Sequence, residues 1–283
     1  LQPVDLAGLL ELSSEDDRQI MIGLLKAYLS AEVISHLAPE VREELLERLA
    51  PREIAAVAAK LDSDDAVDLV EELDDEQREA VMANLSREDR AHVEEALTYP
   101  AESAGRLMQR EVVSVPEGWT VGKTIDHLHD QSQDLPPVFH DIVVVDPYEK
   151  VVGKLHLYHL LREGRSVKVR DIMDEDVRPI PVTTDREEIA YDFRHYRLQS
   201  APVVDAEGKL LGIITIDDMV DVMEEEAEED IRAMAGVGAE ESIHDDVVEV
   251  TKSRFIWLLV NLFTAILAAW SISLFEGSLE KIV

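Results

Sequence analysis

With 283 residues, of which 46% are hydrophobic, the chain is long enough for about two packed domains and some additional segments. Its formal net charge of −34 at pH 7 disfavours nucleic acid and anionic membrane surfaces as partners, because their phosphates would be repelled, and it favours cations. The chain has no cysteine, which excludes disulfides and thiolate zinc sites.

Residues 1–98 are predicted to form an acidic, all-α superhelical domain of short helices. A leucine recurs every twelve residues, and residues typical of helix starts, such as Pro39 and Pro51, follow most of these leucines. Helices this short are marginal alone, so each must bury its apolar side on its neighbours. This favours a compact helical solenoid, with a plain helical bundle as the alternative. The recurring leucines are Leu25, Leu37, Leu49, Leu61, Leu73, Leu85 and Leu97.

Some acids of this domain are candidate cation ligands. Asp64 and Asp68 lie four residues apart, so on a helix their carboxylates share one face. Glu32 lies near another helix start. The helix dipole favours acids in a first turn, which suffices to explain Asp65 but not Asp68, one turn deeper. Asp68 is therefore the stronger candidate of these two.

The composition changes after residue 98, and two related halves follow, at 99–166 and 167–223. Each half is predicted to be α/β, in the order strand, helix, strand, turn, strand, helix. The apolar runs IVVV (142–145) and LLGIIT (210–215) are rich in β-branched residues, as buried strands are. The two halves therefore indicate a tandem repeat of one small domain.

This tandem resembles a pair of cystathionine-β-synthase (CBS) domains. The strongest match is GIITIDDM at 212–219, which is similar to the family's Gly-x-x-Thr-x-x-Asp ending. The resemblance implies contacts from Thr215 and Asp218 to an adenine nucleotide such as ATP. In the first half His156 and His159 stand at the corresponding positions, which argues against nucleotide binding there. No histidine spacing in the sequence indicates zinc.

An acidic stretch comes next, with nine carboxylates between Asp217 and Asp230 and no basic residue. Its apolar residues favour a helix, in which acids four apart repel by roughly 0.2–0.5 kcal/mol per pair. We interpret residues 224–250 as an acidic connecting helix and linker that couples the sensor-like tandem to the C-terminal segment of the chain. The alternative is an acidic helix face that is merely solvated.

The run from Phe255 to Phe275 has 21 residues without a charge and predicts one transmembrane α-helix within the segment 251–283. A buried core helix is the alternative. More basic residues precede the run than follow it, which places residues 1–250 in the cytoplasm. Since one span cannot enclose a pore, and the chain starts at Leu1 rather than Met, we expect it to be part of a longer, multi-pass protein of the plasma (inner) membrane.

The whole chain resembles the cytosolic part and first transmembrane helix of the MgtE family of magnesium channels and transporters. The matching motifs are AEVISHLAPE (31–40), SDDAVDLV (63–70), ESAGRLM (102–108) and TIDDMVDVMEEEAEEDI (215–231). The resemblance implies a homodimer joined through its CBS domains and an acidic plug helix at the pore mouth. It also implies that Mg²⁺ bridges the N-terminal domain, the CBS pair and the plug and holds the pore closed, and that low Mg²⁺ releases it.

Carried over position by position, the resemblance implies a set of Mg²⁺ ligands. They are Glu32, Asp64, Asp68, the carbonyl of Arg106, Asp218, Asp221, Glu226, Glu229 and Asp230. The alternative function is a membrane-tethered CBS sensor of adenine nucleotides that regulates another transporter. An enzyme is not expected, because no nucleophile–base pair or glycine-rich phosphate loop is visible.

Overall fold

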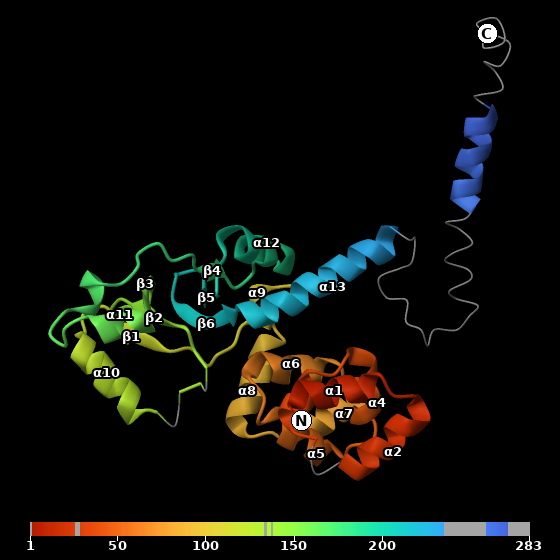
Figure 1. The fold of residues 1–283 in the computed structure, drawn as a ribbon, viewed down its shortest axis with the longest axis horizontal. Helices are drawn as coiled ribbons and strands as arrows, with labels where there is room; N and C mark the ends of the chain where they lie inside the picture. Colours follow the sequence, from red (N-terminus) through yellow and green to blue (C-terminus); the bar gives the residue numbers. More distant parts are fainter. Residues whose placement is uncertain (1, 26–28, 133–134, 137, 235–258, 271–283) are drawn as a thin grey trace, which may run out of the picture. The chain divides into compact units, whose positions relative to one another are not determined.

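The computed structural model describes residues 2–25, 29–132, 135–136, 138–234 and 259–270. They belong to two compact units, residues 1–219 and 220–283. Figure 1 shows the chain as a ribbon.

The N-terminal part of the first unit is a series of short helices, as predicted. Helix α1 packs against α3, α5 against α7, and α6 against α8, so each of these helices contacts the next but one. This alternating pattern is typical of a solenoid and confirms the predicted short-helix architecture. The helices are α1 (Pro3–Glu11), α2 (Glu15–Leu25), α3 (Ala31–Ser35), α4 (Pro39–Leu46), α5 (Pro51–Ala58), α6 (Ser63–Glu71), α7 (Asp75–Met82) and α8 (Arg87–Ala96).

The leucine repeat forms the core of this helical domain. Leu37, Leu73 and Leu85 are buried in one hydrophobic cluster, and the other four repeat leucines pack against the same cluster. A repeat of twelve residues therefore brings one leucine per helical unit to the common core. The predicted helix starts are also present: Pro39 and Pro51 occupy the first turns of α4 and α5.

Two α/β halves follow the short helix α9 (Ala104–Leu107) in the same unit. In each half, the first strand pairs in parallel with the second, and the second pairs antiparallel with the third. The predicted element order is thus confirmed in both halves. The first half contains β1 (Ser114–Pro116), α10 (Val121–Asp130), β2 (Asp141–Val145), β3 (Val151–His156) and α11 (Leu157–Arg162); the second contains β4 (Ile180–Pro181), α12 (Arg186–Tyr196), β5 (Ser200–Val204) and β6 (Leu210–Thr215).

The same turn chemistry closes the β-hairpin of each half. Asp146 Oδ1 accepts hydrogen bonds from the backbone N–H groups of Tyr148 (2.7 Å) and Lys150 (2.9 Å). Asp205 Oδ1 accepts the equivalent bonds from Glu207 (2.9 Å) and Lys209 (2.8 Å). An aspartate that holds its own turn in this way explains why both hairpins share one register.

Helix α13 (Ile216–Met234) begins directly after β6 and carries the acidic stretch. It runs through the predicted boundary at residues 223 and 224 without a break, and the predicted continuation of the acidic segment to residue 250 lies outside the described residues. Residues 259–270 are helical. Among the described residues, no helix is long and apolar enough to cross a membrane, and both ends of the predicted span 255–275 lie outside them.

Candidate cation site

The junction between β6 and α13 places Thr215 and Asp218 one turn apart. The hydroxyl of Thr215 donates a hydrogen bond of 2.6 Å to Oδ2 of Asp218, and the side-chain amide of Gln109 donates to the same oxygen at 3.2 Å. Gln109 is held by two backbone bonds to Ile213 of β6, at 2.7 and 2.8 Å. The carboxylate of Asp218 is thus oriented by Gln109, which precedes the first α/β half, and by Thr215, the last residue of the second half.

Asp64, in the first turn of α6, is the buried acid of the N-terminal domain. Only 7% of it is exposed, and its Oδ1 has no hydrogen-bond partner. Burial raises the pKa of Asp64 well above its usual value of 3.8, and the negative charges of Asp218 and Asp65 raise it further. Ionising a carboxyl group in this position is costly, so Asp64 either keeps its proton or needs a cation beside it.

In three neighbouring acids the protein also disfavours the ionised carboxylate and so raises the pKa. Burial, followed by the charge of Asp217, raises the pKa of Asp218 to about 7, although the bond from Thr215 acts in the opposite direction. Asp68 is exposed, and partial desolvation by the surrounding protein raises its pKa to about 7, against the lowering effect of Arg42. Solvent screens the charge of exposed Asp68, so the anion of buried Asp64 is the more strongly destabilised of the two. The pKa of Asp62, which is also exposed, is likewise raised, first by partial desolvation and then by the charge of Glu111.

This arrangement is suited to a hydrated divalent cation. Mg²⁺ prefers oxygen ligands, keeps several waters and needs only one or two carboxylates from the protein. In the described part of the chain, no group of three or more His, Cys, Asp or Glu side chains is arranged to hold a metal ion. Among the described acids, the unpartnered oxygen of Asp64 and the nearby charge of Asp218 are the features that suit such an ion.

The structure brings together only part of the predicted ligand set. Asp64, Asp68 and Asp218 belong to one electrostatic cluster. Glu32 is exposed in the first turn of α3 and is not among the main groups that shift those pKa values. The remaining predicted acids lie on α13 in the second unit: Asp221 is exposed, Glu226 is partly buried, and the side chains of Glu229 and Asp230 lie outside the described residues.

Sequence reasoning missed Asp65 and Asp62 as members of this cluster. Asp65 is among the groups that raise the pKa values of Asp64, Asp68 and Asp218, so it does more than complement a helix dipole. Asp62 occupies the N-cap position of α6 but makes no side-chain capping bond. The dense run of acids at 62–68 was the available signal, but their convergence on Asp218 depends on tertiary structure.

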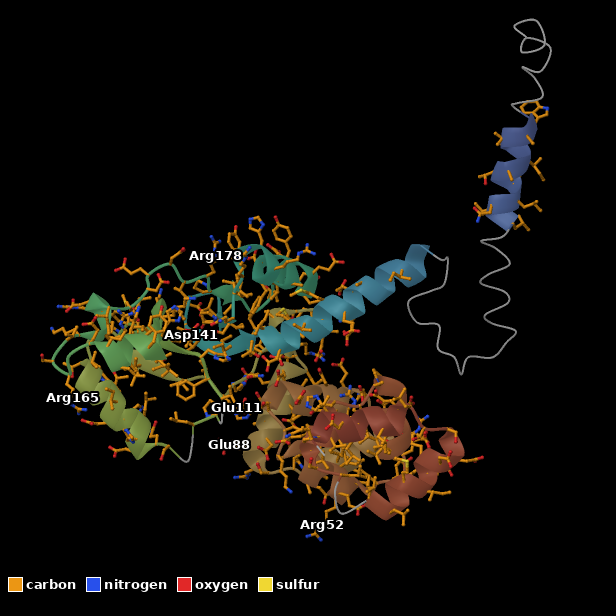
Figure 2. All side chains as sticks on the ribbon, viewed as in Figure 1. Arg52, Glu88, Glu111, Asp141, Arg165 and Arg178 are labelled. Carbon is orange, nitrogen blue, oxygen red and sulfur yellow. The ribbon has the colours of Figure 1, made fainter. Side chains whose placement is uncertain are left out.

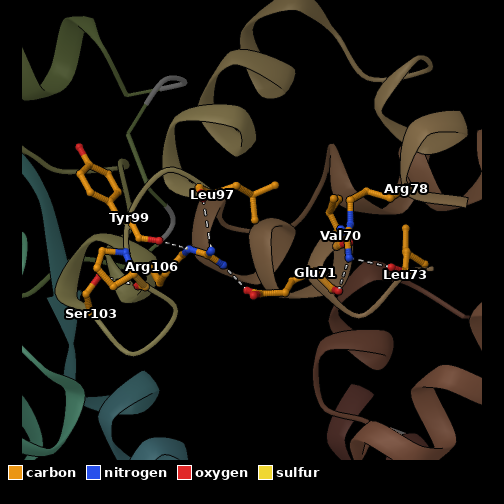
Figure 3. A network of polar contacts seen from close by, with 9 residues as sticks. Val70, Glu71, Leu73, Arg78, Leu97, Tyr99, Ser103 and Arg106 are labelled. Atoms are coloured by element: carbon orange, nitrogen blue, oxygen red, sulfur yellow. Dashed lines mark hydrogen bonds and ion pairs between the residues drawn. The ribbon is translucent and has the colours of Figure 1, made fainter. Parts of the chain in front are cut away.

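Arg106 contributes a side-chain function that the sequence did not indicate. Its guanidinium pairs with Glu71 of α6 and donates to the carbonyls of Tyr99 (3.1 Å) and Leu97 (3.4 Å), as Figure 3 shows. Arg78 binds backbone carbonyls near the end of α6 in a similar way. These two arginines fix the end of α6, whose first turn carries Asp64.

Ser63 at the start of α6 connects the helical domain directly to the segment before β1. Its hydroxyl donates to Glu111 and accepts from the backbone N–H of Arg110, both at 2.8 Å. A serine at a helix start ordinarily caps its own helix. Here it binds a segment nearly fifty residues further along the chain.

A solenoid of short helices joined to two tandem α/β halves defines a CBS-pair protein with a helical N-terminal domain. Family comparisons agree with this description: the MgtE intracellular N domain matches residues 1–102, and the CBS domain matches residues 104–166 and 169–225. The chain therefore belongs to the MgtE family.

Individual relatives support the assignment. The chain is 32% identical to the magnesium transporter MgtE of Thermus thermophilus, over all of the chain and 64% of the relative, and 28% identical to that of Bacillus subtilis, over all of the chain and 62% of the relative. It thus spans less than two thirds of these transporters. The chain is also similar to the crystal structure of the cytosolic domain of the Mg²⁺ channel MgtE in complex with ATP, with 33% sequence identity and a TM-score of 0.71. The match covers 78% of this chain and 90% of that structure.

Proposed function

We propose that this chain is the Mg²⁺-sensing regulatory region of an MgtE-type magnesium channel or transporter. The observation that carries the proposal is the buried, unpartnered carboxylate oxygen of Asp64 next to the charge of Asp218. One acid belongs to the helical domain and the other to the first turn of α13. A cation that neutralises both stabilises their approach, so binding and docking are one equilibrium.

The proposed ligands are carboxylates of the cluster, first Asp64 and Asp218, then Asp68, with the carbonyl of Arg106 completing the set. Glu32 and the α13 acids Asp221, Glu226, Glu229 and Asp230 extend it. Charge repulsion among these acids separates the parts when Mg²⁺ is low, which frees α13 as a plug and opens the pore. In the whole protein, residues 255–275 form the first transmembrane helix in the plasma (inner) membrane, and residues 1–250 are cytoplasmic and dimerise through the CBS domains.

A titration of the full chain in detergent with Mg²⁺ tests this proposal, with calorimetry and small-angle scattering as readouts. We expect Asp64→Asn and Asp218→Asn each to weaken binding at least tenfold and to abolish compaction. Asp75→Asn, at an exposed acid in the first turn of α7, is the matched control and should leave both the Mg²⁺ affinity and the compaction unchanged. An unchanged affinity in Asp64→Asn and Asp218→Asn, or an equal loss in the control, would contradict the proposal.

A second function, adenine-nucleotide sensing at the CBS pair, is favoured by the relative solved with ATP. In this chain the Thr215 hydroxyl donates to Asp218, so a ribose or phosphate group would have to replace that bond. ATP and Mg²⁺ would then compete for Asp218. Because ATP itself chelates Mg²⁺, the comparison is made at matched free Mg²⁺: weaker Mg²⁺ binding in the presence of ATP then supports this function, and independent binding of the two argues against it.

A further inference from the structure

The two halves differ at one pair of equivalent positions. In the second half, Ser200 of β5 faces Thr215 of β6 across the antiparallel pair. In the first half, Asp141 of β2 faces His156 of β3 in the same register. His159 lies three residues after His156, as Asp218 lies three after Thr215. The first half thus has imidazoles at both positions where the second half has a hydroxyl and a carboxylate.

Each of these imidazoles has its Nδ1 held by an oxygen. Nδ1 of His156 bonds to Oδ1 of Asp141, which is only 4% exposed, and Nδ1 of His159 bonds to the carbonyl of Ile172 at 3.2 Å. The other oxygen of Asp141 accepts from the Ser200 hydroxyl at 3.2 Å and lies 4.0 Å from the ammonium of Lys154. The region around Asp141 is visible in Figure 2.

These bonds fix the tautomer of both rings. A carbonyl oxygen or an ionised carboxylate only accepts hydrogen bonds, so Nδ1 must carry the proton in each ring. In the neutral imidazole, Nε2 then holds the lone pair. An Nδ1–H bonded to a carboxylate or a backbone carbonyl is the arrangement found in histidines that ligate metals, because it orients the ring and makes Nε2 more basic.

The spacing of the two rings also suits a shared ion. Their centroids are 5.8 Å apart and their planes make an angle of 76°. Two imidazoles on one zinc ion, each with a Zn–N distance of about 2.0–2.1 Å, have centroids roughly 5–6 Å apart. Tyr158 stacks on His156 and contacts His159 edge-on, so it packs against both rings.

We propose that His156 and His159 bind one divalent transition-metal ion through Nε2, at a site distinct from the acidic Mg²⁺ cluster. Imidazole favours Zn²⁺ or Ni²⁺ over Mg²⁺. Only two protein ligands are present, since the described residues contain no group of three metal-binding side chains, so waters fill the remaining positions. His156 is partly exposed, which lets solvent reach the ion. The net charge of −34 favours a cation over an anionic ligand at these rings.

The test is a Zn²⁺ titration of the untagged full chain in detergent, by competition with a chromophoric chelator and by the NMR signals of its nine histidines. We expect one ion per chain and joint shifts of the His156 and His159 signals. His156→Asn or His159→Asn should each weaken binding at least tenfold, and Asp141→Asn about 10–100-fold. Excess Mg²⁺ should leave Zn²⁺ binding unchanged, so the result is independent of the function proposed above.

His195→Asn is the matched control, because His195 has the same aromatic surroundings on α12. It stacks on Tyr191 at 5.3 Å and meets Tyr196 edge-on at 4.8 Å. The His195→Asn substitution should not change the Zn²⁺ affinity. Equal shifts of all nine histidines, or wild-type affinity in His156→Asn and His159→Asn, would overturn the proposal. Thermal unfolding of each variant separates a lost ligand from a lost fold.

Discussion

Thr215 and Asp218 form a 2.6 Å hydrogen bond across the junction where β6 ends and α13 begins. Because Gln109 donates to the same carboxylate oxygen, Oδ2 of Asp218 receives two donors. These bonds favour the ionised form of Asp218, whereas burial opposes it. The strength of the proposed cation site therefore depends on a hydroxyl that does not itself bind the ion.

The first prediction concerns Thr215→Val, which removes this hydroxyl. The pKa of Asp218 should then rise above its present value of about 7, because the lowering hydrogen bond is lost. Mg²⁺ affinity near neutral pH should fall severalfold and recover as the pH is raised, since the ion needs the ionised carboxylate. Thr215→Ser keeps a hydroxyl and serves as the control. A pH-independent loss of affinity in Thr215→Val would contradict this explanation.

The second prediction concerns stability as a function of pH. The pKa values of Asp64, Asp68 and Asp218 are raised on folding, so the folded state binds more protons than the unfolded state between about pH 4 and 7. The stability that these groups contribute is complete below their unfolded pKa and is lost as the pH rises through their folded pKa. Without divalent ions, the melting temperature should therefore fall towards neutral pH.

The control for this pH dependence is Asp218→Asn, which should flatten the decline. At neutral pH it should stabilise the ion-free protein by roughly 1–2 kcal/mol, after allowance for solvent screening. Mg²⁺ should stabilise the wild type more at neutral pH than at about pH 5, because protons compete with the ion. If stability without Mg²⁺ rises through this range in the wild type relative to the variant, the proposed linkage is wrong.

The third prediction separates the side chain of Arg106 from its carbonyl. The guanidinium pairs with Glu71 and binds two carbonyls, so Arg106→Gln should destabilise the protein by roughly 1–3 kcal/mol in thermal or denaturant unfolding. The proposed Mg²⁺ ligand is the backbone carbonyl, which the substitution keeps. The Mg²⁺ affinity of the folded variant should therefore change little. Arg52→Gln, at an exposed position of α5, should shift stability by less than about 0.5 kcal/mol.

The fourth prediction compares Asp68 with Asp65. Asp68 is a proposed ligand, whereas Asp65 raises the pKa values of its neighbours by its charge. Asp68→Asn should weaken the Mg²⁺ response. Asp65→Asn should lower the neighbouring pKa values and leave the response intact or shift it to lower pH. Equal losses in the two variants, measured by scattering or calorimetry, would contradict the assignment of Asp68.

The fold was predictable where a local pattern repeats. The leucines at twelve-residue intervals predicted the helical core, and the predicted order of strands and helices recurs in both α/β halves. The site was predictable only in part. Asp218 and Asp64 are 154 positions apart in the sequence, and their interaction depends on how α6 and the β6–α13 junction are placed. The hydrogen bonds at His156 and His159 likewise need tertiary contacts that no local pattern contains.

The last prediction concerns α13 as a conditional structure. Its acids repel each other by only tenths of a kcal/mol per pair, yet nine such charges together can outweigh a marginal docking interface. Monovalent salt screens charges over about 8 Å at 0.15 M, so KCl should relieve this repulsion in part. Mg²⁺ should do more, because one ion can bind carboxylates from two segments at once.

Limited proteolysis measures this difference directly. Residues 217–235 should be protected by Mg²⁺ at concentrations where KCl of equal ionic strength gives no protection. Joint neutralisation of Asp218, Asp221 and Glu226 should abolish the protection or make it independent of Mg²⁺, because the charges that the ion must bridge are then removed. Asp75→Asn, remote in sequence and exposed on α7, should retain the wild-type response. If KCl protects as well as Mg²⁺, α13 is a screened surface helix, and regulation through metal-dependent docking of this helix fails.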